Sequence, residues 1–310
     1  MILCAGESLI DLIGEERKGV KQSEYFKARA GGSPLNVAIG LSRLGKDVAF
    51  LTKVGNDHFG KKIIDFLIAE KVRTDYVFID DNRKTPLAFV ALSKDKEPEY
   101  EFYRQSTADL YIEDENVSKV NLEEIEIFHF GSISLIEGKT AENLINLFYS
   151  MKEKGIVTSL DPNVRSNLIL NIEDYKDRMM KLMKEVDILK LSVEDLKFFF
   201  PNGSFEPFVE FLDREAKLTF LTLGEKGSLA FFRGKLFRSG AKKPGTVVDA
   251  TGCGDAYMAA ILYKVSQIGY SNLNEDNLHD VMDFASTVAG FVATRYGAAT
   301  SMPGRKELKI

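Results

Sequence analysis

The chain has 310 residues, of which 45% are hydrophobic and 28% are charged, and this is the composition of an ordinary globular protein. A formal net charge of −5, with acidic and basic residues interspersed, argues against a nucleic acid or an anionic membrane as the partner. Two cysteines, Cys4 and Cys253, imply no disulfide framework and favour a reducing compartment such as the cytoplasm. No basic leader opens the chain, and no apolar run reaches the ~18 residues of a membrane span.

Short apolar runs alternate with longer segments of helical period along the whole chain. Residues 2–8 and 47–55 predict strands, whereas 35–45 and 60–72 predict helices. The alternation continues with predicted strands at 125–133, 156–162, 187–192 and 218–224, and with predicted helices at 141–155, 175–186, 255–268 and 278–295. This order predicts an α/β fold with a doubly wound, mostly parallel sheet, helices on both faces and a ligand site at the carboxyl ends of the strands.

Two segments, about 12–30 and 84–105, break this alternation and predict β-rich insertions. We expect them to form a small β lid packed over one edge of the main sheet. Because no internal repeat or linker is present, the chain is expected to be a single domain over residues 1–310. Asp11 is expected to end the first strand, and thus to lie at the carboxyl edge of the main sheet.

The stretch DATGCGDAYMAAIL, residues 249–262, places two glycines and an aspartate before an apolar helical run. Gly252 and Gly254, with Cys253 between them, predict an anion hole, because glycines let an anion approach the unpaired N–H groups of a helix N-terminus. Asp255 would then take a proton from a hydroxyl group while the hole stabilises a developing phosphoryl charge. Alternatively, Asp255 is only a favourable acidic residue in the first helical turn.

A second glycine cluster lies at residues 30–45. Gly31 and Gly32 allow the backbone to approach a ligand, and Asn36 offers both a donor and an acceptor, which suits a polyhydroxylated substrate. The alternative is an ordinary turn beside a solvated acid. A P-loop is excluded at residues 137–140 because Ile133 occupies the place of its first glycine. A dinucleotide motif is excluded because Tyr257 stands in place of the third glycine.

Together, the stretches GGSPLNVAIGLSRLG, KVGNDHFG and DATGCGD resemble the signatures of the PfkB carbohydrate kinases, also called the ribokinase-like family. The resemblance runs from GESLIDL to GAATSMP and covers nearly the whole chain. It implies a doubly wound sheet with a β lid over the sugar, ATP as the phosphoryl donor, Mg²⁺, and K⁺ as a further ion. Within the family, EFYRQSTADLYI, HFGSISLIEG and SLDPNVRSNL are most similar to fructokinases, with 2-keto-3-deoxygluconate kinases as near neighbours.

The resemblance also implies roles for individual residues. Asp255 is the base, Gly252, Cys253 and Gly254 supply backbone N–H groups, and Arg165 lies toward the phosphates. The implied sugar-binding residues are Asp11, Gly31, Gly32, Asn36, Phe102 and Arg104, with Phe102 and Arg104 on one face of a lid strand. The implied nucleotide-binding residues are Asn163, Thr222, Gly224, Gly227 and Ser286, together with Gly252 and Gly254. The implied ion-binding residues are Glu194 or Asp195 for ordering Mg²⁺, and Asp249, Thr251, Gly297 and Ser301 for K⁺.

The leading hypothesis is an ATP-dependent kinase that phosphorylates the 6-hydroxyl of fructose. One alternative keeps the chemistry and changes the acceptor to 2-keto-3-deoxygluconate or another sugar. A second alternative, of another class, is a sugar-binding regulatory protein without turnover. We expect a cytoplasmic protein that binds sugar and ATP, binds neither nucleic acid nor membrane, and forms a homodimer through the lid. Cys253 departs from the alanine that is usual in the anion-hole loop of the family.

Overall fold

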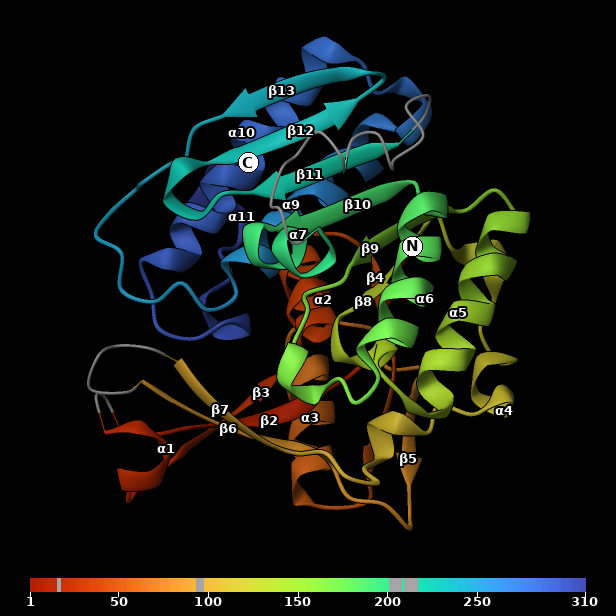
Figure 1. Ribbon diagram of the computed structural model, residues 1–310, viewed down its shortest axis with the longest axis vertical. Coiled ribbons are helices and arrows are strands. Elements are labelled where there is room, and N and C mark those ends of the chain that lie inside the picture. Colours follow the sequence, from red (N-terminus) through yellow and green to blue (C-terminus); the bar gives the residue numbers. More distant parts are fainter. Residues whose placement is uncertain (16–17, 93–97, 201–207, 209–216) are drawn as a thin grey trace.

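The computed structural model describes residues 1–15, 18–92, 98–200, 208 and 217–310. Its larger sheet has nine strands in the order β13-β12-β11-β10-β9-β8-β1-β4-β5 (Figure 1). The bounds are β1 Ile2–Ala5, β4 Val48–Gly55, β5 Val77–Asp80, β8 Ile127–Gly131, β9 Val157–Asp161, β10 Ile188–Ser192, β11 Leu218–Thr222, β12 Ser228–Phe232 and β13 Lys235–Ser239. Neighbouring strands from β5 to β11 pair in parallel, and β12 and β13 add an antiparallel edge. The prediction of a mostly parallel sheet is confirmed.

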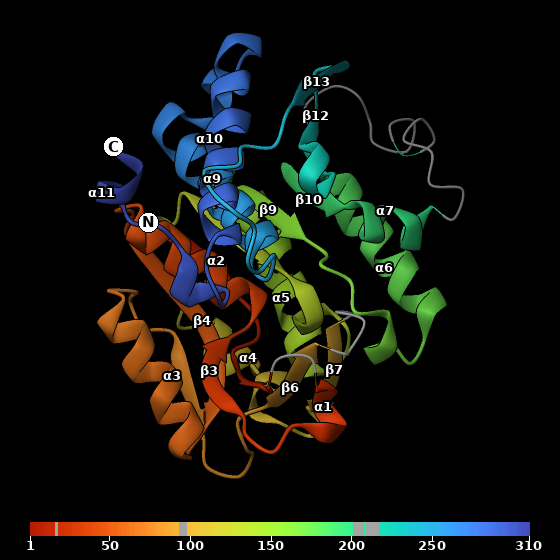
Figure 2. The ribbon, with the colours of Figure 1, turned by 90° about the vertical axis from the view of Figure 1, so that its left-hand side faces the viewer.

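Helices cover both faces of this sheet, as Figure 2 shows edge-on. One face carries α2 Ser33–Arg43, α3 His58–Ala69, α9 Cys253–Ile268 and α10 Glu275–Ala293, and the other carries α5 Gly138–Glu153, α6 Ile172–Glu185 and α7 Val193–Phe199. The short helices are α1 Gly19–Gln22, α4 Asp114–Val117 and α11 Arg305–Leu308. The buried apolar side chains form two clusters, one including Phe50, Ala259 and Val281, the other Phe128, Leu144 and Met179. Burial of the sheet on both sides explains why its strands are continuous apolar runs.

The helices α2 and α9 pack closely against each other. A Cβ atom added at Gly40 of α2 would lie only 2.8 Å from the Cβ of Ala259 in α9. The glycine therefore lets the two helix axes approach each other. This approach matters for the site, because the N-terminal turns of both helices open toward the smaller sheet.

The smaller sheet has the strand order β3-β2-β6-β7, with β2 Leu9–Ile13, β3 Lys27–Gly31, β6 Leu87–Leu92 and β7 Pro98–Tyr103 (Figure 1). All four strands lie in or overlap the segments expected at 12–30 and 84–105, although β2 begins three residues before the first segment. The prediction that Asp11 ends the first strand is wrong: β1 ends at Ala5, residues 6–8 carry the chain into the smaller sheet, and Asp11 lies in the middle of β2. The apolar run at the start of the chain therefore contains two strands, β1 and β2.

No helix within the described residues is long and apolar enough to cross a membrane.

Asp57 links the start of α3 to the segment just before β6 of the smaller sheet. Its Oδ1 atom accepts hydrogen bonds from the N–H groups of Phe59 at 3.0 Å and Gly60 at 2.8 Å, which makes Asp57 the N-cap of α3. The same carboxylate accepts from the N–H and the hydroxyl of Thr85, each at 2.9 Å, just before β6. Burial raises the pKa of Asp57, but the hydrogen bonds from Thr85 and Gly60 outweigh it and hold the pKa below its ordinary value.

We predict that Asp57→Ala lowers the free energy of unfolding by about 2 kcal/mol, because a helix cap and the partner of Thr85 are lost together. The lowered pKa means that this stabilisation is complete above the unfolded-state pKa of about 3.9 and is lost as the pH falls below it. Urea unfolding should therefore show a gap between variant and wild type at pH 7 that narrows toward pH 3. A variant as stable as wild type at pH 7 would contradict the capping role.

Candidate active site

A pocket of about 340 Å³ lies between the two sheets. Its walls come from the smaller sheet, from the segments that follow β8 and β9, and from the N-terminal turns of α2 and α9. It is lined by these predicted site residues: Asp11, Gly32, Asn36, Phe102, Asn163, Arg165, Asp249, Thr251, Gly252, Asp255 and Gly297. The expected ligand site at the carboxyl ends of the strands is thus a real cavity.

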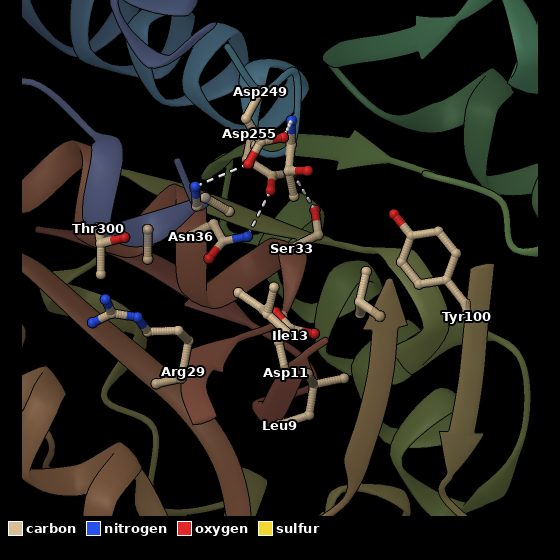
Figure 3. A pocket seen from close by; sticks show the side chains of 18 of the residues that line it. Leu9, Asp11, Ile13, Arg29, Ser33, Asn36, Tyr100, Asp249, Asp255 and Thr300 are labelled. Carbon is tan, nitrogen blue, oxygen red and sulfur yellow. Dashed lines mark hydrogen bonds between the residues drawn. The ribbon is translucent and has the colours of Figure 1, made fainter. Parts of the chain in front are cut away.

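Asp255 lines this pocket and is held by side chains of α2 (Figure 3). The hydroxyl of Ser33 donates to its Oδ1 at 2.7 Å, and the Nδ2 of Asn36 donates to its Oδ2 at 2.7 Å. No side chain caps the N-terminus of α9, and Asp255 bonds across to α2 instead of to its own helix. These contacts favour the interpretation as a proton acceptor over that of a helix cap.

Burial raises the pKa of the Asp255 carboxyl, of which only 7% is exposed. The hydrogen bonds from Ser33 and Asn36 oppose this shift, and the positive charges of Lys190 and Arg165 oppose it further. A carboxylate with a raised pKa is a better proton acceptor than an exposed one, provided that it stays ionised at the working pH. The neighbours of Asp255 counteract part of the effect of its burial, and the net direction of the pKa stays upward.

The glycine loop before α9 is shaped by close contacts. Gly252 has the left-handed conformation with φ +80°, and a Cβ atom there would lie 2.7 Å from Ala298. The N–H of Cys253 donates to the carbonyl of Ala250 at 3.2 Å, so it is already engaged by the protein. Burial, followed by the charges of Asp249 and Asp255, raises the pKa of the Cys253 thiol to about 12, and the side chain is therefore a neutral thiol at physiological pH.

The sugar-facing wall contains a second carboxylate, that of Asp11. A Cβ atom at Gly31 would clash with the Oδ2 of Asp11, and one at Gly32 would lie 2.6 Å from the carbonyl oxygen of Glu7. The two glycines thus make room for the acidic residues of the wall. Burial, together with the charge of Asp255, raises the pKa of Asp11 to about 7, while Arg165 lowers it. Asp11 lies below Asp255 on the same side of the pocket (Figure 3).

Arg104 does not share a pocket face with Phe102, and that prediction is wrong. Phe102 and Tyr100 stack at 6.1 Å on β7 and line the pocket, but β7 ends at Tyr103. Arg104 turns away because its Nε donates to the Oδ2 of Asp109 at 2.6 Å, and both side chains are buried. The arginines that line the pocket are Arg29 and Arg165.

The residues expected at the nucleotide fall into two groups. Asn163 and Arg165 line the pocket, and the Oδ1 of Asn163 accepts from Arg165 at 2.8 Å. Outside the pocket lie Thr222 at the end of β11, Gly224 and Gly227 around the turn before β12, and Ser286, which is buried in α10. The role of this second group stays a prediction.

The acids expected to order Mg²⁺ do not form a protein-held metal site. The carboxylate of Asp195 accepts from the N–H of Val164 at 2.7 Å and from the N–H and hydroxyl of Ser192 at 2.8 and 2.7 Å, whereas Glu194 is exposed. Among the described residues, no group of three or more His, Cys, Asp or Glu side chains is arranged to hold a metal ion. Asp195 thus has a local structural role at the start of α7.

The residues expected to bind K⁺ lie in two loops, around Asp249 and around Gly297, that are joined by a hydrogen bond. Asp249 accepts from the N–H of Thr251 at 2.8 Å and from that of Gly297 at 2.9 Å. The hydroxyl of Ser301 donates to the carbonyls of Gly297 and of Ala298, the latter at 2.8 Å. Carboxylate and carbonyl oxygens are the donors that hard cations prefer, so the donor set is compatible with an alkali ion.

Sequence reasoning did not identify several residues that the structure brings to the site. Ser33 holds Asp255, and the N–H of Ser33 donates in turn to Glu7 at 3.2 Å. Behind the glycine loop, Lys190 pairs with Asp161 at 2.6 Å. The available signal for Lys190 was a lysine inside the apolar strand run 187–192, where a charge needs a partner.

Comparison with known proteins identifies the family of the chain. The model of the family described as "pfkB family carbohydrate kinase" matches residues 1–305. Probable fructokinase-5 of Arabidopsis thaliana is 32% identical over 311 residues, covering 98% of this chain and 94% of the relative. Fructokinase-1 of Oryza sativa subsp. japonica is 32% identical over 315 residues, covering 99% and 96%.

Solved structures show the same similarity. A fructokinase from Xylella fastidiosa with bound ATP superposes with a TM-score of 0.90 at 30% identity, covering 99% of this chain and 96% of that one. A fructokinase from Vibrio cholerae O395 in a fructose, ADP and potassium ion bound form has a TM-score of 0.83 at 25% identity, covering 99% and 96%. The chain belongs to the pfkB family of carbohydrate kinases.

Proposed function

We propose that this protein is an ATP-dependent fructokinase that transfers the γ-phosphoryl group of ATP to the 6-hydroxyl of fructose. The observation that carries the proposal is the buried Asp255 carboxylate, held by Ser33 and Asn36 at the N-terminus of α9 and facing the pocket. The fructokinases among the similar proteins support the choice of acceptor. A regulatory protein without turnover would have no use for a proton acceptor placed in this way.

In the proposed reaction, the sugar hydroxyl lies between Asp255 and the γ-phosphorus of ATP. Asp255 takes the hydroxyl proton as the oxygen bonds to phosphorus, and the bond from phosphorus to the bridging oxygen of ADP breaks. The uncapped N-terminus of α9 and Arg165 stabilise the charge on the transferred group. A divalent ion that enters with ATP would neutralise phosphate charge, since the described residues offer no metal-binding cluster of their own.

The charges of the pocket favour a neutral sugar over a sugar acid. Five acidic side chains line it, those of Glu7, Asp11, Glu15, Asp249 and Asp255, and the lining arginines are Arg29 and Arg165. A substrate carboxylate would meet more negative than positive groups, while sugar hydroxyls can donate to Asp11. Arg104, an implied sugar-binding residue, is already paired with Asp109.

We further propose Mg²⁺ as the divalent ion, K⁺ as an ion bound near Asp249, and the cytoplasm as the compartment. The oxygen donors of the loop at Gly297 and Ser301 support the K⁺ site. A homodimer formed through the smaller sheet stays a prediction.

We predict that Asp255→Asn folds and binds ATP but loses a factor of ~10²–10⁴ in kcat, the usual contribution of a general base. The structure tolerates the change, because the amide can accept from Asn36 and donate to the Ser33 oxygen. The measurement is steady-state ADP release together with ATP titration. Asp280→Asn, the same change at an exposed residue of α10, is the matched control and should retain wild-type kcat. An Asp255→Asn variant within a few-fold of wild type would reject the base.

We predict that kcat/KM for fructose exceeds that for 2-keto-3-deoxygluconate, as measured by coupled ADP release across a panel of sugars. Excess EDTA should abolish the activity, Mg²⁺ should restore it, and replacement of K⁺ by choline should lower it. Arg104→Ala should impair both sugars alike, because Arg104 is tied to Asp109. A wild-type preference for the sugar acid that Arg104→Ala removes would overturn the acceptor while leaving the kinase assignment intact.

A further inference from the structure

Lys190 places a buried ammonium directly behind the glycine loop of the active site. The residue belongs to β10, and its Nζ lies 2.6 Å from the Oδ2 of Asp161 at the end of β9. Only 4% of the Lys190 side chain and 1% of the Asp161 side chain are exposed. A Cβ atom added at Gly254 would lie 3.2 Å from the Nζ, so the ammonium packs against the first turn of α9.

The position of the Lys190 ammonium beside the N-terminus of α9 is electrostatically unfavourable. The N-terminus of α9 already carries a partial positive charge, and a lysine beside it adds to an unfavourable like-charge contact. Burial lowers the pKa of the Lys190 ammonium, but the charges of Asp161, Asp195 and Asp255 outweigh it, and the net direction is upward. Lys190 is therefore a cation at physiological pH. The Lys190 ammonium and the partial charge of the α9 N-terminus together suit a site that receives phosphate.

We propose that Lys190 is a positioning residue for phosphoryl transfer: held by Asp161 behind Gly254, its ammonium favours the ionised form of Asp255 and adds positive charge behind the anion hole. This inference rests on the proposed function. Because its side chain is buried beneath the loop, Lys190 acts through Asp255 and the N-terminus of α9, without touching the substrate.

Several groups besides Lys190 act on the ionisation of Asp255. Ser33 and Asn36 of α2 donate hydrogen bonds to it, and Arg165 is the other cation that lowers its pKa, with a smaller effect than Lys190. The other charged and titratable groups around it are Asp11 of β2, Asp161 of β9, Tyr100 of β7, Cys253 of α9, and Glu7 and Asp249 of the pocket wall. The neighbouring His129 is neutral, because burial and Lys190 lower its pKa to about 3.

Three variants separate this electrostatic role from a merely structural ion pair: Lys190→Met, Asp161→Asn, and the double variant that carries both changes. The measurement is kcat, KM and the pH dependence of kcat/KM for the sugar that the wild type turns over best. Lys190→Met should lower kcat by about tenfold or more, change KM by less than about threefold, and move the acidic limb of the profile upward by about one pH unit. Asp161→Asn removes a negative charge, so its acidic limb should stay in place or move downward.

The double variant keeps the inference testable if a single variant folds poorly. Breaking a buried ion pair leaves one uncompensated charge, whereas replacing both partners is often nearly neutral for stability. The double variant should therefore unfold at a higher temperature than the less stable single variant, and still show the raised acidic limb of Lys190→Met. A double variant with wild-type kcat and a wild-type acidic limb would overturn the proposal and leave the pair a structural one.

The same profiles distinguish a failure of this inference from a failure of the proposed function. If Asp255→Asn keeps the wild-type acidic limb, Asp255 is not the titrating base, and the proposed mechanism fails together with the role of Lys190. If Asp255→Asn removes the limb but Lys190→Met leaves it unmoved, the mechanism stands and only the role of Lys190 is rejected.

Discussion

The hydrogen bonds from Ser33 and Asn36 to Asp255 are the contact on which the active site depends. Asp255 is only 7% exposed, and its carboxyl group needs donors, because an unpaired buried charge is among the most unfavourable features a fold can carry. Both donors come from the first turns of α2, and α2 can reach α9 only because Gly40 lets the helices approach. The close packing of α2 against α9 is therefore also what places the donors of Asp255.

One polar atom at this contact has no partner within the protein. Among the described residues, the Oδ1 of Asn36 is buried without a hydrogen bond, and Asn36 lines the pocket. Other buried atoms without a hydrogen bond, such as the Oγ1 of Thr219, belong to residues that do not line it. A folded protein rarely leaves such groups unpaired, and where it does, a ligand or a functional role is the usual explanation. The Oδ1 of Asn36 is therefore available to accept a hydrogen bond from a bound ligand.

Much of this arrangement followed from the sequence, because local patterns determined it. Apolar periodicity located α2, α9 and α10 to within a few residues, and the glycines around Cys253 placed Asp255 in the first turn of a helix. The sequence pattern did not predict β12 or β13, which are short and lack an intervening helix. Strand position was the weak link, since it is decided by pairing partners far away in the chain.

The misplaced and overlooked side chains have two physical causes. Asp11 was assigned to the wrong sheet because a turn at residues 6–8 interrupts an apolar run without a strong turn signal. Arg104 was assigned to the pocket because strand alternation cannot reveal that Asp109 captures it. Lys190 was overlooked because its partner, Asp161, lies 29 residues away along the chain. Tertiary ion pairs and hydrogen bonds decide where charged side chains point, and no local pattern records them.

The most direct test of the central claim is the pH dependence of kcat/KM for Ser33→Ala. Removing the Ser33 hydroxyl takes away a hydrogen bond that holds the pKa of Asp255 down against its burial. The account predicts that the acidic limb moves to higher pH, while activity at alkaline pH stays closer to that of wild type. An acidic limb that coincides with that of the wild type would contradict the claim that Asp255, held by Ser33, is the group whose ionisation controls the reaction.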